Sequence, residues 1–214
     1  PSRGLGDVYK RQVLNSLLEK HGRPTVSYSA VRANVSNGAR ALTELGFGVG
    51  PDDASFAPLL DELLNAYEQH LAVDTVLFPG LAEVLDWLDA QQLPWGIVTN
   101  KPARFTGPVL EGLNLHQRVG PVICPDHVKQ RKPDPEGLLI AAQDDNVSPA
   151  NCLYVGDHLR DIQAGQNAGM ETAVAAFGYI DADDDPRGWQ ANYYLEQGSE
   201  LLPLLQKLYE QKAH

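Results

Sequence analysis

The first third of the chain has apolar residues at three- and four-residue steps and lacks the alternation that is typical of strands. The clearest stripe lies between residues 56 and 67, and another lies between residues 13 and 18. A further helix is expected over residues 29–45, because several glycines follow it. The pattern predicts a small helical unit whose inward positions are Val13, Leu14, Leu17, Leu18, Phe56, Leu59, Leu60, Leu63, Leu64 and Tyr67.

After residue 78 the pattern changes, and short apolar runs alternate with amphipathic segments. Such an alternation is typical of a parallel sheet with helices on both faces. We therefore expect an α/β fold with right-handed crossovers in this part of the chain. The expected strands are residues 95–98, 122–124, 153–155 and 172–174, and the expected helices include residues 81–88, 105–110, 138–140, 162–168 and 201–208.

Composition and charge narrow the class of protein. Hydrophobic residues make up 43% and charged residues 21% of the sequence, which is ordinary for a globular protein. The net charge of −11 disfavours a nucleic-acid partner, and no apolar run approaches the roughly 20 residues of a membrane span. Residues 1–12 lack the apolar segment of a signal peptide, and the two cysteines form no C-x-x-C pair. These features predict a cytoplasmic protein without nucleic-acid or membrane partners.

In open α/β sheets, ligands bind beyond the carboxyl ends of the strands, so the residues after each apolar run are candidates. Thr99 and Asn100 follow the first run, and their hydroxyl and amide groups can hold phosphate oxygens. Lys132 follows the second run and precedes Pro133, which favours an extended backbone and a side chain that acts as a point charge. In isolation, an ordinary turn explains Thr99 and Asn100 better than phosphate binding does, and a solvated basic loop is the better explanation of Lys132.

Two carboxylates follow the third apolar run. Asp157 stands at the expected strand end and Asp161, four residues later, opens the next helix. Paired carboxylate oxygens suit Mg²⁺, although an acidic residue at a helix start also stabilises the helix dipole. A hydroxyl, a lysine and two carboxylates at one sheet edge can bind Mg²⁺ together with a phosphate group.

Three segments carry a family resemblance. Val-Thr-Asn-Lys-Pro at residues 98–102, Lys-Pro at residues 132–133 and Gly-Asp-His-Leu-Arg-Asp at residues 156–161 resemble motifs II, III and IV of the haloacid dehalogenase (HAD) superfamily. Residues 123–128 and 177–180 resemble its bacterial phosphoglycolate phosphatases, and most of all the branch that contains the N-acetylmuramic acid 6-phosphate phosphatases. The similarity runs from about residue 13 to about residue 208.

The resemblance implies a Rossmann-like parallel sheet over residues 77–214, with an inserted α-helical cap over residues 12–76. It implies hydrolysis of a small phosphorylated metabolite through an aspartyl-phosphate, with Mg²⁺ as cofactor, by a monomer or homodimer. It gives catalytic roles to Thr99 and Lys132, substrate binding to Gly38, Arg40 and Asn100, and metal binding to Asp157 and Asp161.

The sequence departs from the family at motif I, an apolar strand that ends in D-x-D-G-T and supplies the nucleophile. The only aspartate before residue 52 is Asp7, which has neither a second aspartate two residues later nor a following Gly-Thr. Residues 1–11 do not resemble the family, and we interpret them as a non-family leader. The first core strand is therefore expected to be absent, and the chain is expected to show little or no turnover.

Several interpretations of the function remain open at this point. Phosphoglycolate and a phosphorylated amino sugar, N-acetylmuramic acid 6-phosphate, are both plausible substrates. A non-catalytic HAD-like protein that binds phosphorylated ligands is the alternative of another class. A metal-independent dehalogenase is disfavoured by the pair Asp157 and Asp161, and a mutase, which shares the cap, is disfavoured by Asn100.

Overall fold

The computed structural model of the chain describes residues 5–34, 38–68, 75–180 and 184–212. The chain divides into two compact units, Pro1–Asp74 and Thr75–His214. The first is purely helical in its described part and the second is α/β, which are the two kinds of structure that the sequence pattern predicts. Among the described residues, no helix is both long and apolar enough to cross a membrane.

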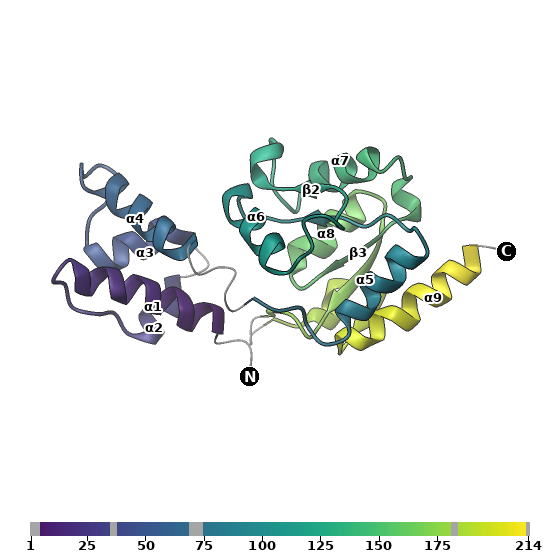
Figure 1. Cartoon of the computed structure of the whole chain (residues 1–214), viewed down its shortest axis with the longest axis horizontal. Helices are drawn as coiled ribbons and strands as arrows, with labels where there is room; N and C mark the ends of the chain where they lie inside the picture. The colour runs from purple at the N-terminus through teal and green to yellow at the C-terminus, as the bar shows by residue number, and fades with distance from the viewer. Residues whose placement is uncertain (1–4, 35–37, 69–74, 181–183, 213–214) are drawn as a thin grey trace. The chain divides into compact units, whose positions relative to one another are not determined.

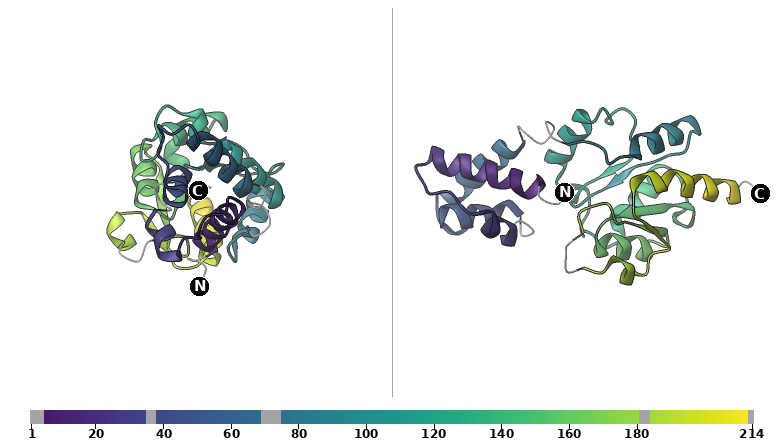
Figure 2. Two further views of the ribbon diagram at one scale, coloured as in Figure 1. Left: turned by 90° about the vertical axis from the view of Figure 1, so that its left-hand side faces the viewer. Right: turned by 90° about the horizontal axis from the view of Figure 1, so that it is seen from below.

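The helical unit is held together by the predicted apolar stripes. Leu14 and Leu18 have no exposed surface, and they pack with Val31 and Leu63 in one core cluster. Side chains spaced by three and four residues lie on one face of a helix, so the buried residues of these helices meet in a single core cluster. Figure 2 shows the four helices of this unit from two further directions. The helices are α1 (Leu5–Lys20), α2 (Tyr28–Asn34), α3 (Gly38–Phe47) and α4 (Phe56–Glu68).

The single helix predicted over residues 29–45 is wrong. The structure has α2 and α3 in its place, and residues 35–37 between them lie outside the described residues. Gly38 has a φ of 81°, a left-handed conformation that an α-helix cannot continue through. Helix α1 runs through residues 11 and 12, where the sequence suggests the end of a non-family leader. That boundary stays a prediction, and residues 1–4 of the leader lie outside the described residues.

The α/β unit contains the expected parallel strands. Strands β1 and β2 pair in parallel, with Ile97 opposite Val122, and β3, β4 and β5 form a second parallel sheet. Among the described residues no strand joins the two sheets, and the absence of a first core strand stays a prediction. The sequence analysis missed β5, because three residues are too few to show a period. The strands are β1 (Ile97–Val98), β2 (Val122–Ile123), β3 (Leu153–Gly156), β4 (Glu171–Ala175) and β5 (Tyr193–Leu195).

Helices cover both faces of the larger sheet (Figure 1). Ala173 and Val174 are neighbours on β4 and point to opposite faces, and each is buried in a different cluster. Ala173 packs with Val84 of α5, whereas Val174 packs with Ile162 of α8. The helices of this unit are α5 (Leu81–Ala90), α6 (Ala103–Gly112), α7 (Glu136–Asp144), α8 (Leu159–Asn167) and α9 (Leu201–Lys212), with short 3₁₀ turns at Pro125–His127, Pro149–Asn151, Pro186–Trp189 and Gly198–Glu200.

Candidate active site

The carbonyl group of Val98, at the end of β1, points away from the neighbouring strand. The N–H groups of Ile97 and Thr99 donate to carbonyls on the β2 side, at 2.8 and 2.9 Å. Because successive residues of a strand face opposite sides, the Val98 carbonyl faces the outer edge of β1. A partly buried carbonyl needs donors, and here they come from two side chains, Lys132 and Tyr154, each at 2.9 Å.

Lys132 is held by three acceptors. Its Nζ atom donates to the Val98 carbonyl at 2.9 Å, to the Tyr154 hydroxyl at 2.8 Å and to Asp161 Oδ1 at 2.8 Å. An ammonium group has three N–H donors, so each donor has a partner. The side chains of Lys132 and Asp161 are only 10% and 9% exposed. The structure thus brings these two predicted site residues, 29 positions apart, into one buried ion pair.

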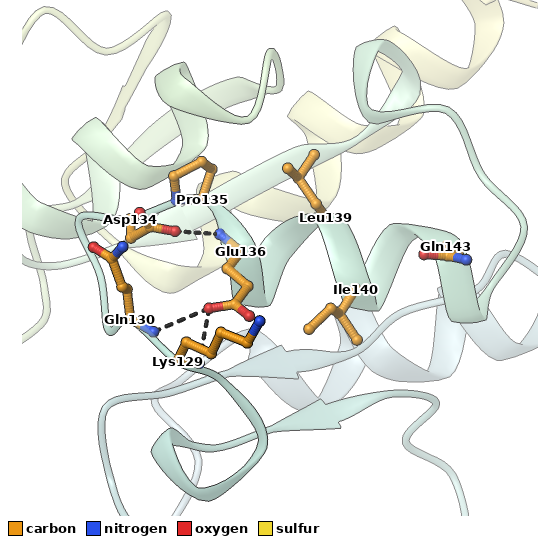
Figure 3. Close-up of a pocket in the computed structure, with 8 residues that line it drawn as sticks. All are labelled: Lys129, Gln130, Asp134, Pro135, Glu136, Leu139, Ile140 and Gln143. Atoms are coloured by element: carbon orange, nitrogen blue, oxygen red, sulfur yellow. Dashed lines mark hydrogen bonds between the residues drawn. The ribbon is translucent and has the colours of Figure 1, made fainter.

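Two carboxylates close to Lys132 in the sequence, those of Asp134 and Glu136, hold the backbone of the loop that contains it. Glu136 Oε2 accepts from the backbone N–H groups of Lys129 and Gln130 at 2.8 and 3.0 Å, and Asp134 Oδ1 accepts from the Glu136 N–H at 2.9 Å (Figure 3). These bonds fix the turn on either side of Lys132. A surface pocket lies on the outside of this turn, and its lining contains none of the predicted site residues: Lys129, Gln130, Asp134, Pro135, Glu136, Leu139, Ile140 and Gln143.

Close backbone approaches position the two aspartates. Asp157 Oδ2 accepts from the backbone N–H of Tyr179 at 2.8 Å. A Cβ atom on Gly178 would lie 2.4 Å from the Asp157 Cβ, and one on Gly156 would lie 2.3 Å from the Asp161 Cβ. Both distances are shorter than any real contact, so glycine at these two positions lets the backbone approach the carboxylates.

Tyr154 is a site residue that the sequence analysis missed. Burial raises the pKa of its hydroxyl group, and the nearby charges of Asp161 and Asp157 raise it further. The phenol is therefore neutral, donates its proton to the Val98 carbonyl and accepts from Lys132. A tyrosine on a strand of a covered sheet needs a hydrogen-bond partner, and this was the available signal in the sequence.

Thr99 and Asn100 occupy the turn after β1. The Thr99 hydroxyl accepts from the Lys101 N–H at 3.0 Å, and Asn100 Nδ2 donates to the Lys132 carbonyl at 3.5 Å. Asn100 thus links the turn after β1 to the loop that contains Lys132. The predicted roles of Thr99 and Asn100 in phosphate binding stay predictions.

Gly38 and Arg40 belong to the helical unit. The Arg40 guanidinium lies over the ring of Phe56, 5.5 Å from its centroid, and Gly38 opens helix α3. Their predicted contact with the substrate stays a prediction.

The carboxylates of Asp157 and Asp161 are of the chemical type that binds Mg²⁺. Within the described ranges there is no group of three or more His, Cys, Asp or Glu residues that could hold a metal ion. Mg²⁺, however, is commonly bound by one or two carboxylates, with waters and substrate phosphates as the other ligands. Asp157 follows β3 and Asp161 lies in the first turn of α8, and their carboxylates are ligands of this kind. Their binding of Mg²⁺ stays a prediction.

Comparison with known proteins identifies the family. The family model for haloacid dehalogenase-like hydrolases matches residues 4–175. The chain is 41% identical over 189 residues to the N-acetylmuramic acid 6-phosphate phosphatase of Pseudomonas putida, covering 88% of this chain and 85% of that protein. It is 38% identical over 188 residues to the phosphoglycolate phosphatase of Xanthomonas campestris pv. campestris, with the same coverage of 88% and 85%.

Solved structures share the fold. The crystal structure of a predicted phosphoglycolate phosphatase from Haemophilus somnus superposes with a TM-score of 0.78 at 21% sequence identity, over 93% of this chain and 91% of that one. The resemblance of the three motifs, the α/β fold and the matched relatives agree. This chain, which is similar to the two phosphatases above, therefore belongs to the haloacid dehalogenase-like hydrolase family.

Proposed function

We propose that the protein is built as a Mg²⁺-dependent phosphomonoester hydrolase for a small phosphorylated metabolite. The observation that carries this proposal is the buried ammonium of Lys132, paired with Asp161 beyond the carboxyl ends of the parallel strands. A fixed positive charge beside carboxylates is the arrangement that phosphoryl transfer requires. The phosphatase relatives support the same chemistry.

Each site residue has a role that follows from its chemistry. Lys132 stabilises negative charge as it develops on the phosphoryl oxygens, and Thr99 and Asn100 hold those oxygens in the turn after β1. Asp157 and Asp161 would hold Mg²⁺, which neutralises charge and orients the phosphoryl group when bound. Arg40 and Gly38, from the helical unit, contact the remainder of the substrate.

We also propose that this 214-residue chain has little turnover by itself. The family's reaction uses one aspartate that attacks phosphorus and another that protonates the leaving alcohol. Both belong to D-x-D-G-T, which does not occur in this sequence. Residues 1–11 have no role in this proposal, because they contain no D-x-D-G-T.

The test compares two proteins. The first is the chain as it stands, and the second carries a strand ending in D-x-D-G-T in place of residues 1–11. With an aryl phosphate and Mg²⁺, the first is expected to stay at background and the second to turn over, with loss of activity in Lys132→Ala and Asp157→Ala. Robust hydrolysis by the first protein that Asp157→Ala abolishes would contradict the proposed inactivity. Failure of the second on every small phosphate ester would contradict the proposed function.

Two substrates are supported by relatives of nearly equal identity, at 41% and 38%. The ratio of kcat/KM for N-acetylmuramic acid 6-phosphate and phosphoglycolate, measured on the second protein, decides between them. Binding of phosphate esters without any hydrolysis would instead favour the non-catalytic alternative.

A further inference from the structure

Tyr154 is the least explained member of the site, because none of the family motifs contains it. Its hydroxyl oxygen lies 2.8 Å from Lys132 Nζ and 2.9 Å from the Val98 carbonyl, and Lys132 Nζ lies 2.9 Å from the same carbonyl. The three atoms form a nearly equilateral triangle. The triangle connects β3, β1 and the loop after β2, across 56 positions of sequence between Tyr154 and Val98.

A lysine side chain has a flexible four-carbon stem, so its charged end needs external contacts to hold one position. Tyrosine has far fewer rotatable bonds, and the body of Tyr154 is fixed by packing. It contacts the buried cluster formed by Leu138, Ala164 and Ala168. The hydroxyl group is therefore a rigid reference point for the ammonium of Lys132.

The hydroxyl group can serve both contacts only in its neutral form. Burial raises its pKa above the ordinary value, so the proton is retained at physiological pH. That proton is donated to the Val98 carbonyl, while an oxygen lone pair accepts from Lys132. With two N–H groups of Lys132 held by Tyr154 and Val98, the third is directed toward Asp161 and the carboxylate side of the site.

We propose that Tyr154 is a positioning residue, which fixes the direction of the Lys132 ammonium and thereby sets the affinity of the site for a phosphoryl group. The phosphoryl part of this inference rests on the proposed function. The geometric part concerns only Tyr154, Val98 and Lys132.

Another strand of the same sheet provides a control. Tyr193 of β5 donates its hydroxyl proton to Glu171 Oε2 at 2.9 Å and packs in the cluster on the other side of the sheet. Tyr193→Phe removes a tyrosine hydroxyl and its hydrogen bond to Glu171 from the same sheet without touching Lys132. A purely structural role for Tyr154 predicts that Tyr154→Phe and Tyr193→Phe behave alike.

The experiment measures the reactivity of the Lys132 amino group in the full chain. Trace acetylation with site-resolved mass spectrometry gives the reaction rate of Lys132 relative to the exposed Lys129 of the same loop, and calorimetry gives the affinity for inorganic phosphate with Mg²⁺ present. In the wild-type chain Lys132 is expected to react much more slowly than Lys129. Tyr154→Phe is expected to raise the relative rate of Lys132 several-fold and to weaken phosphate binding about 5-fold, the effect of one hydrogen bond. Tyr193→Phe is expected to change neither.

Three results would overturn the inference. Equal effects of Tyr154→Phe and Tyr193→Phe on both measurements would reduce Tyr154 to a packing role. Wild-type Lys132 that reacts as fast as Lys129 would contradict the geometry, even if Tyr154→Phe failed to fold. Absence of phosphate binding by the wild-type chain would contradict the proposed function and the phosphoryl part of the inference, while the acetylation rates would still decide the geometric part.

Discussion

Lys132→Met tests how strongly the buried ion pair stabilises the α/β unit. Methionine keeps the length of the apolar stem and removes the ammonium. The Asp161 carboxylate, 9% exposed, then loses its charged partner, and the Val98 carbonyl and the Tyr154 hydroxyl each lose a donor. Breaking a buried pair by removing one partner costs about 3–5 kcal/mol. With a urea m-value of about 2 kcal/mol/M, the midpoint of unfolding is expected to fall by about 1.5–2.5 M.

Tryptophan fluorescence during urea unfolding reports on this unit alone, because Trp87, Trp95 and Trp189 all lie within it. Lys129→Met is the matched control, since it removes an exposed ammonium from the same loop and is expected to change the stability by less than about 0.5 kcal/mol.

A double variant separates the charge from the packing. Adding Asp161→Asn to Lys132→Met removes the uncompensated charge and is expected to recover at least part of the lost stability. A cost below about 1 kcal/mol for Lys132→Met, or no recovery in the double variant, would refute this account of the site.

Three further predictions concern other parts of the chain. Gly178→Ala places a Cβ 2.4 Å from that of Asp157, so we expect a loss of about 1–3 kcal/mol in urea unfolding and faster hydrogen exchange near the displaced carboxylate. The Ala103 N–H donates to the Asp126 carboxylate and lowers its pKa, so the stability from this bond is present above about pH 4 and is lost as the pH falls through the lowered pKa. In a plot of the urea midpoint against pH, Asp126→Asn is expected to reduce the slope at acid pH. An unchanged slope would contradict the role of the bond. Leu14→Ala empties a fully buried position of the helical unit and should cost about 2–5 kcal/mol in circular-dichroism melts, whereas a cost near zero would place this side chain outside the core.

Local periodicity explains why most elements could be predicted. The runs that became β1–β4 are apolar because both faces of a parallel sheet are covered, and the stripes of α1 and α4 follow the helical period. The prediction failed where one residue changes the backbone or an element is too short. Gly38 takes a left-handed conformation that separates α2 from α3, and β5 is a three-residue strand.

The chemical groups of the site and the family could be predicted from the sequence alone. Lys132, Asp157 and Asp161 stand shortly after apolar runs. Each motif is a single strand followed by a loop or a helix, so its residues are close together in the sequence and can be recognised there. The lack of D-x-D-G-T is likewise a property of the sequence.

The way in which these groups hold one another depends on the tertiary structure. The ion pair between Lys132 and Asp161 joins a loop to a helix. The hydrogen bonds that Lys132 and Tyr154 donate to the Val98 carbonyl join that loop and β3 to β1. No local pattern encodes such contacts, because they depend on which strands are neighbours and on which side each carbonyl points. The sequence thus supplies the reactive groups, and the pairing of the strands supplies their positions.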